Sequence, residues 1–357
     1  MIAEAWIAAR RLHTHHLWGP PLATAEDVVE FFGAMQAQEF VPAKWSIAQR
    51  AADATDGVMT ALIDDGVLLR THVVRPTWHF VLAEDLRRLL AVTGPRVHAL
   101  NAYQYRALGL DDEVAGTTNG LIAAALAGGR QMTRTEIGSL LAEHGIPATG
   151  LRLGYVLMRA ELDAVIVSGA PRGRQHTYAL FDDRVPAADP VPPEEALADL
   201  TLRYFRSRGP ATVRDYVRWS SLTVADARAG LSMVGSQLER TDVAGRTYWS
   251  AHGTDPAPVD SPRIDLIQAY DEYVMSYSES RDVMLGQVTV PDANRVAYLH
   301  TILVDGRLAG HWKHTVRARK VIVDTYLYHP LDERGSRAMD AAVRRFGMYF
   351  DAEAIWR

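Results

Sequence analysis

The sequence contains no cysteine, which excludes disulfide bonds and thiolate metal sites. It has no run of about 18 apolar residues, the length that a membrane-spanning helix requires. Its first residues lack the basic region and apolar block of a signal peptide. Neither a Gly-rich phosphate loop nor a Gly-x-Ser-x-Gly nucleophile motif occurs. These absences predict a cytoplasmic protein that makes no membrane contact and carries no cofactor.

Three histidines near the N-terminus, His13, His15 and His16, are the only dense group of metal-binding side chains. No cysteine or nearby carboxylate completes a metal site around them. We therefore predict no metal and interpret the three as an exposed polar helix end.

The bulk composition is that of a soluble globular protein, with 48% hydrophobic and 23% charged residues. A length of 357 residues is too great for one ordinary core and predicts two to four domains. The net charge of −5 argues against a protein that coats nucleic acid. This net charge is compatible with a local basic channel, because salt screens the acidic groups that lie far from such a channel.

Two glutamines two positions apart, Gln36 and Gln38, follow a strongly patterned helix. Thr24 and Asp27 form a capping box at its start, and the apolar spacing predicts a helix from Ala25 to about Gln36. Side chains at i and i+2 diverge on a helix, so both could reach one target only where the backbone leaves helical geometry. Taken alone, an exposed helix end is the more common explanation, since most glutamines are exposed.

The same order of elements, helices followed by a two-stranded hairpin, is predicted three times along the chain. The Thr-x-x-acid helix starts at Thr24, Thr133 and Thr212 support this repeat. From Pro256 onward, β-rich segments and a final amphipathic helix predict a different domain. We expect an α+β protein of three tandem winged helix-turn-helix units and a C-terminal antiparallel β-domain. The expected boundaries are 1–117, 118–190, 191–255 and 256–357.

Basic residues gather at three places that suit contact with DNA phosphates. Each cluster alone is equally consistent with a solvated surface. They are an acid-free run with His311 and His314 in the C-terminal sheet (Lys313, Arg317, Arg319, Lys320), a group in the third unit (Arg203, Arg206, Arg208, Arg214, Arg218), and the second wing (Arg172, Arg174).

The chain resembles the AlkZ-like DNA glycosylases over essentially its whole length. Five short motifs in the same order carry this resemblance: Gln36-Ala37-Gln38; Arg75-Pro76-Thr77-Trp78-His79-Phe80; Gly209-Pro210-Ala211-Thr212 with Trp219-Ser220; Asp271-Glu272-Tyr273 with Tyr277 and Arg281; and Val304-Asp305-Gly306-Arg307 with Gly310 and Trp312. The family has a Gln-x-Gln signature in its AlkZ branch and Gln-x-Asp in its YcaQ branch, so this sequence is similar to the former.

The resemblance implies that the three winged-helix units form a concave DNA channel. It also implies excision of N7-alkylated purines and, in some members, unhooking of interstrand crosslinks. It makes Gln36 and Gln38 the candidate catalytic residues, and Arg75 and His79 candidates to line the channel near them. His79 is equally well explained as a core histidine beside Trp78 and Phe80. Asp271 and Glu272 are candidate orienting acids, although the start of a helix or strand would explain this acidic pair nearly as well.

The chemistry of N7-alkylpurines fits a pair of carboxamides. The alkylated base is positively charged and leaves without protonation, so the enzyme mainly has to position a water and stabilise charge. Glutamine does not take up a proton at neutral pH, so another group or solvent must do so. We predict a monomeric, monofunctional glycosylase acting on double-stranded DNA. A non-enzymatic winged-helix DNA-binding protein or transcriptional regulator, and a family member that only shields lesions, remain as alternatives.

Overall fold

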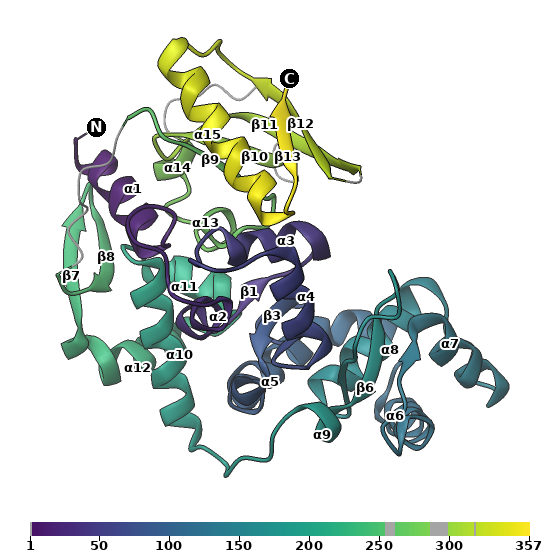
Figure 1. Cartoon of the computed structure of the whole chain (residues 1–357). Coiled ribbons are helices and arrows are strands. Elements are labelled where there is room, and N and C mark those ends of the chain that lie inside the picture. Colours follow the sequence, from purple (N-terminus) through teal and green to yellow (C-terminus); the bar gives the residue numbers. More distant parts are fainter. Residues whose placement is uncertain (1, 254–260, 286–298, 318) are drawn as a thin grey trace. The chain divides into compact units, whose positions relative to one another are not determined.

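The computed structural model describes residues 2–253, 261–285, 299–317 and 319–357 (Figure 1). The chain divides into two compact units. Unit 1 contains residues 1–59, 201–219 and 223–357, and unit 2 contains residues 60–200 and 220–222. The sequence also predicts a linker over 257–262 and a strand over 295–304. Residues 257–260 and 295–298 of these segments lie outside the described residues. Within the described ranges, no helix is long and apolar enough to span a membrane.

Unit 1 combines N-terminal helices, a middle segment and a C-terminal sheet. Helices α4 and α10 run from one unit into the other. The elements are α1 (Ile2–Thr14), α2 (Ala25–Phe32), β1 (Met35–Gln36), α3 (Phe40–Ala48), α4 (Asp56–Asp64), α10 (Pro193–Arg208), α11 (Val213–Ser220), α12 (Val224–Val234), η2 (Gly235–Gln237), β7 (Leu238–Val243), β8 (Arg246–Ala251), β9 (Ile264–Ile267), α13 (Glu272–Met275), α14 (Asp282–Leu285), β10 (His300–Val304), β11 (Arg307–Arg317), β12 (Lys320–Leu327), α15 (Glu333–Tyr349) and β13 (Glu353–Trp356).

The C-terminal sheet has the strand order β13-β12-β11-β10-β9. Neighbouring strands are antiparallel except β12 and β13, which are parallel. Helix α15 lies along this sheet (Figure 1) and packs Phe346 against Trp312 of β11, with ring centroids 5.0 Å apart. Phe346 also contacts Trp45 of α3 at 5.0 Å. One aromatic core therefore joins the C-terminal sheet to the helix that follows the glutamine motif.

Unit 2 is built from helices and two small antiparallel sheets. Its helices α6, α7 and α8 share an apolar core that includes Ile122, Ile137 and Leu157. The elements are β2 (Leu68–His72), β3 (Trp78–Leu82), η1 (Ala83–Asp85), α5 (Leu86–Ala107), α6 (Asp112–Leu126), β4 (Met132–Thr133), α7 (Arg134–Glu143), α8 (Gly150–Leu162), β5 (Ile166–Ser168), β6 (Thr177–Leu180) and α9 (Phe181–Arg184). The three winged-helix units, their boundaries and the concave channel remain predictions.

The helix before the glutamines ends earlier than the sequence pattern predicted. Helix α2 stops at Phe32, because Gly33 adopts a left-handed φ of +71° that continues no helix. The chain then extends through β1 (Met35–Gln36). Two further differences concern α5 and the C-terminal segment. The 22-residue helix α5 has no counterpart among the predicted elements. The final helix, predicted over Ser336–Ala352, ends at Tyr349 and is followed by the strand β13.

Candidate functional site

The two glutamines of the motif lie on non-helical backbone, because Gln36 ends the extended strand β1 and Gln38 occupies a bend before α3. Gln36 is buried, with 3% of its surface exposed, whereas Gln38 is exposed. The explanation that suits a glutamine taken alone, an exposed helix end, therefore does not describe Gln36, and neither glutamine lies on a helix. Leaving helical geometry is the condition under which two side chains at i and i+2 can serve one target.

The carboxylate of Glu272 holds the backbone of the glutamine motif in place. Its Oε1 accepts a hydrogen bond from the backbone N–H of Gln36 at 2.7 Å. Its Oε2 accepts hydrogen bonds from Arg208, at 2.8 Å from Nη2 and 3.0 Å from Nε. The same oxygen accepts from the indole of Trp219 at 2.8 Å and from the hydroxyl of Ser276 at 3.0 Å. A buried carboxylate with this many donors is held in a single position.

Arg208 extends this support to the chain before the motif. It donates to the carbonyl oxygens of Phe32 and Ala34, at 2.9 and 2.7 Å. These two carbonyls flank Gly33, where helix α2 ends. Arg208 is completely buried, so it does not belong to the exposed phosphate-contacting group in which the sequence placed it. A buried guanidinium needs a paired carboxylate, which Glu272 provides.

Asp271 makes a second buried ion pair, with Arg50 from the loop after α3. The two nitrogens of Arg50 donate to the two carboxylate oxygens at 2.9 and 2.7 Å. Ser46 of α3 donates to the same carboxylate at 2.7 Å. Both acids thus connect α13 to the segments on either side of the glutamines. Glu272 holds the strand that carries Gln36, and Asp271 holds the helix that follows Gln38.

Four predicted site residues belong to unit 2. Arg75 is half-buried and His79 is buried on the β2–β3 hairpin. Arg172 and Arg174 are exposed between β5 and β6. Arg172 donates to Glu136 at 2.7 Å and to the carbonyl of Gln131 at 2.9 Å. Their proposed roles toward DNA remain predictions.

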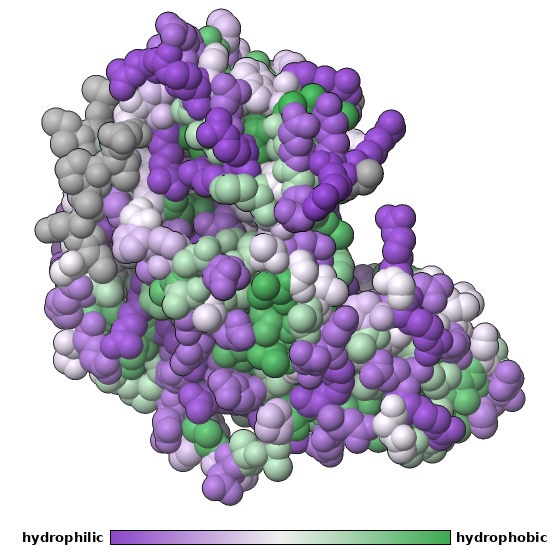
Figure 2. All heavy atoms as spheres, viewed as in Figure 1, coloured by the Kyte–Doolittle hydropathy of each residue, from purple (hydrophilic) through white to green (hydrophobic). Residues whose placement is uncertain are grey.

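Three residues of the basic run of the C-terminal sheet, Arg317, Arg319 and Lys320, lie at the tip of the β11–β12 hairpin, whereas Lys313 lies farther along β11, opposite Asp324 of β12. Lys313, Arg317, Arg319 and Lys320 are all exposed. Arg317 and Lys320 face each other across the two strands. Figure 2 shows hydrophilic side chains gathered around this tip. Arg319 pairs with Asp351 at 3.1 Å, but both partners are exposed, so this pair adds little stability.

The N-terminal histidines do not form the uniformly exposed helix end that the sequence suggested. His15 is completely buried, and its Nε2 lies 2.8 Å from the hydroxyl of Tyr277. Burial and the nearby guanidinium of Arg50 lower its pKa well below the usual value. His15 is therefore a neutral core residue. Among the described residues, no group of three or more metal-binding side chains is suited to hold an ion.

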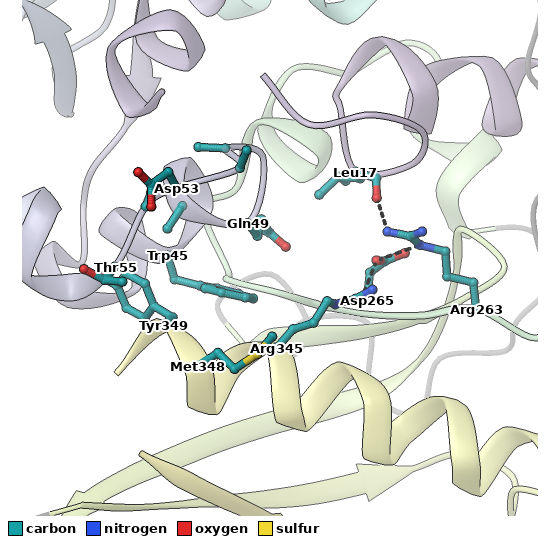
Figure 3. Close-up of a pocket in the computed structure, with 14 residues that line it drawn as sticks. Leu17, Trp45, Gln49, Asp53, Thr55, Arg263, Asp265, Arg345, Met348 and Tyr349 are labelled. Atoms are coloured by element: carbon teal, nitrogen blue, oxygen red, sulfur yellow. Dashed lines mark hydrogen bonds and ion pairs between the residues drawn. The ribbon is translucent and has the colours of Figure 1, made fainter. Parts of the chain in front are cut away.

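A cavity of about 320 Å³ lies in unit 1 between the segment after α3 and helix α15 (Figure 3). Arg263 and Arg345 both point to the buried carboxylate of Asp265, each at 3.3 Å. Gln36, Gln38 and Glu272 are not among the residues that line this cavity. The cavity is thus separate from the glutamine motif, and its charged groups already neutralise one another.

The supporting roles of three residues could not be read from the sequence: Arg50 and Arg208 belong to none of the family motifs, and Trp219 belongs to one but was assigned no partner. Each acts through a partner more than 50 positions away in the chain. The usable signal was the acidic pair Asp271-Glu272 between tyrosines, because a charge in apolar surroundings must find a partner. The identity of that partner depends on the tertiary fold.

Comparison with known proteins identifies the family to which the chain belongs. The family model for DNA glycosylase AlkZ-like proteins matches residues 29–349. An interstrand DNA cross-link repair glycosylase from Streptomyces sahachiroi is 26% identical over 313 residues, which cover 81% of this chain and 82% of the relative. The solved structure of the Streptomyces sahachiroi DNA glycosylase AlkZ has the same fold, with a TM-score of 0.78, 20% identity and 99% coverage of both chains. The chain belongs to the AlkZ-like DNA glycosylase family.

Proposed function

We propose that this protein hydrolyses the N-glycosidic bond of N7-alkylated purines in double-stranded DNA, and that it also accepts purines joined in an interstrand crosslink. Family membership supports the reaction class. The relative named for interstrand cross-link repair supports the bulky substrate. The observation that carries the proposal is the extended Gln36–Gln38 segment, which the buried Glu272 holds by a backbone hydrogen bond.

In the proposed mechanism the two carboxamides place the attacking water. A carboxamide accepts hydrogen bonds through its oxygen and donates them through its nitrogen, so two of them can orient a single water. The bond between C1′ and N9 of the purine breaks, and its electron pair neutralises the positive charge of the alkylated base. The water oxygen bonds to C1′ as the water gives up one proton, which leaves an abasic site with intact strands. Positioning and charge stabilisation then supply most of the rate increase.

The lysines of the chain support a reaction with water rather than with an amine. The sequence has only Lys44, Lys313 and Lys320. Lys44, the lysine nearest to the motif in sequence, is buried and paired with Asp56 at 2.5 Å. An amine that attacks C1′ must reach the substrate with a free electron pair, whereas the Lys44 amine is buried against the carboxylate of Asp56. We therefore propose a monofunctional glycosylase.

The test is base release from duplexes that carry N7-methylguanine or an N7-linked interstrand crosslink. Product strands are treated with alkali to reveal abasic sites. We expect the wild-type protein to release the alkylated base without cutting the strand. Gln36→Ala and Gln38→Ala should bind the duplex with wild-type affinity and release base at least about 100-fold more slowly. Gln237→Ala, at an exposed glutamine after α12, is the matched control and should act like the wild type.

Three results would count against the proposal. Wild-type release rates in both motif variants would remove the glutamines from the mechanism. A sequence-specific footprint without base release would favour a regulator. Protection of lesions from other repair enzymes, again without base release, would favour a shielding protein.

A further inference from the structure

The carboxylate of Glu39 is the titratable group closest in sequence to the glutamine pair. Glu39 directly follows Gln38, and its backbone forms the N-cap of helix α3. A side chain at this position usually caps the free amides of its own helix. The carboxylate of Glu39 makes no such hydrogen bond. It is directed instead toward His300 of β10, whose Nε2 lies 3.6 Å from Oε2.

The position of the proton on the His300 ring follows from the hydrogen bond that Nδ1 makes. Nδ1 of His300 accepts the backbone N–H of Ala269 at 3.1 Å. A neutral imidazole has one donor and one acceptor nitrogen, so Nε2 carries the proton. The N–H of His300 thus points at the Glu39 carboxylate from just beyond hydrogen-bonding distance.

The surroundings of His300 keep it neutral and in place. Its ring packs on Trp312 with centroids 5.0 Å apart and stacks with His314 at 6.4 Å. Burial and His314 lower the pKa of His300 to about 4. Only 13% of its side chain is exposed. At neutral pH, His300 is a fixed, uncharged hydrogen-bond donor.

Glu39 combines access to water with an environment that makes it a better base. Its side chain is 44% exposed, so water and DNA can reach the carboxylate. Partial burial raises the pKa of Glu39 above its usual value. Lys44 on the same helix does not neutralise it, because Lys44 pairs with Asp56. The titratable group that faces this carboxylate is His300 of β10, and His314 of β11 stacks on the His300 ring.

We propose that Glu39 accepts the proton of the attacking water and that His300 is a positioning residue for its carboxylate; this inference rests on the proposed function. Gln36 and Gln38 orient the water but have no capacity to take its proton at neutral pH. As the water oxygen bonds to C1′ and the C1′–N9 bond breaks, one water proton moves to an Oε of Glu39. The released purine carries the bonding electrons away, and Glu39 later loses its proton to solvent. Atoms and charge balance without any further reactant.

The test is the single-turnover rate of N7-methylguanine release between pH 5 and 8, corrected for spontaneous depurination. For the wild type we expect the rate to fall as pH decreases through the pKa of Glu39, because the protonated acid cannot act as a base. Glu39→Gln should be about 100-fold slower at pH 7.5 and should lose this acid limb. Glu279→Gln, at another partly exposed acid of unit 1, is the matched control and should keep both the rate and the acid limb.

His300 variants test positioning separately from folding. In His300→Leu the carboxylate loses a facing N–H donor, so the acid limb should move to higher pH by about one unit. His300→Gln retains an acceptor and a donor and should restore the wild-type profile. Wild-type rates and profiles in Glu39→Gln, with normal release by the wild type, would overturn this inference alone. Absence of any release by the wild type would overturn the proposed function and this inference with it.

Discussion

The carboxylate of Glu272 accepts the backbone N–H of Gln36 at 2.7 Å, although the two residues are 236 positions apart in the chain. This contact joins the C-terminal half of unit 1 to the glutamine motif. The other oxygen of the same carboxylate is bound by Arg208, Trp219 and Ser276. The position of the motif backbone therefore depends on one buried charged group and its partners.

Glu272→Gln is expected to lower the free energy of unfolding by about 3–5 kcal/mol, because it leaves the Arg208 charge buried without a counter-charge. Trp219→Phe removes one neutral donor from an oxygen that keeps three others, and should cost about 1 kcal/mol for the hydrogen bond. Glu279→Gln breaks an exposed pair with Arg214 and should change stability by less than about 1 kcal/mol. Urea unfolding of the three variants measures these losses in the free energy of unfolding and shows whether they rank as expected. Equal losses in all three would show that the buried pair has no special role.

The two glutamines should differ in what they contribute to stability. Gln38 is exposed, so Gln38→Ala should change the free energy of unfolding by no more than about 0.5 kcal/mol. Gln36 is 3% exposed, and Gln36→Ala should cost about 1–3 kcal/mol. Thermal and urea unfolding can be measured on the same preparations as base release. A large loss of stability in Gln38→Ala would mean that its effect on activity could not be separated from folding.

His300 should make the stability of the protein depend on pH. In the folded state burial keeps this residue neutral down to about pH 4, whereas the unfolded chain takes up its proton near the ordinary pKa of about 6.5. Its contribution is fully present above pH 6.5, decreases as pH falls, and is lost by about pH 4. The total is up to about 3 kcal/mol.

The corresponding measurement compares His300→Gln with the wild type by urea unfolding at pH 7.5 and pH 5. The variant should lose less stability between the two pH values, by about 2 kcal/mol. His329→Gln, at an exposed histidine of the same unit, should lose as much as the wild type. Identical pH dependence in all three proteins would show that His300 titrates alike in the folded and unfolded states.

Local signals in the sequence identified many elements of the fold. The capping boxes at Thr24, Thr133 and Thr212 occur in the structure, each with its acid three residues later. Such signals depend on neighbouring residues, so they can be read without the fold. The boundary at Gly33 could have been recognised in the same way, because glycine commonly ends helices. Apolar spacing through Met35 outweighed that signal and extended the predicted helix too far.

The candidate site was predictable only in part. Gln36 and Gln38 were found through a short motif, and Asp271 and Glu272 through their unusual surroundings. Their partners were not predictable, since Arg50 and Arg208 look like any surface arginine in sequence. The strand β13 was missed for a similar reason: its pairing with β12 is parallel and follows a long helix, and no turn signal marks it.

The basic hairpin tip provides a prediction about DNA affinity that does not involve catalysis. If Arg317 and Lys320 contact phosphates, each contact releases a bound cation, and binding weakens with salt. Arg317→Gln combined with Lys320→Gln should lower the slope of log affinity against log salt concentration by about 1.8, or about 0.9 per lost contact. Arg337→Gln removes a similar charge from α15, where Arg337 pairs with Glu333, and serves as the control.

Fluorescence anisotropy with an undamaged duplex at several salt concentrations measures the slope. A double variant with the wild-type slope would place the DNA-binding surface elsewhere, whereas a reduced slope with unchanged single-turnover base release at saturating protein would assign this tip to binding alone.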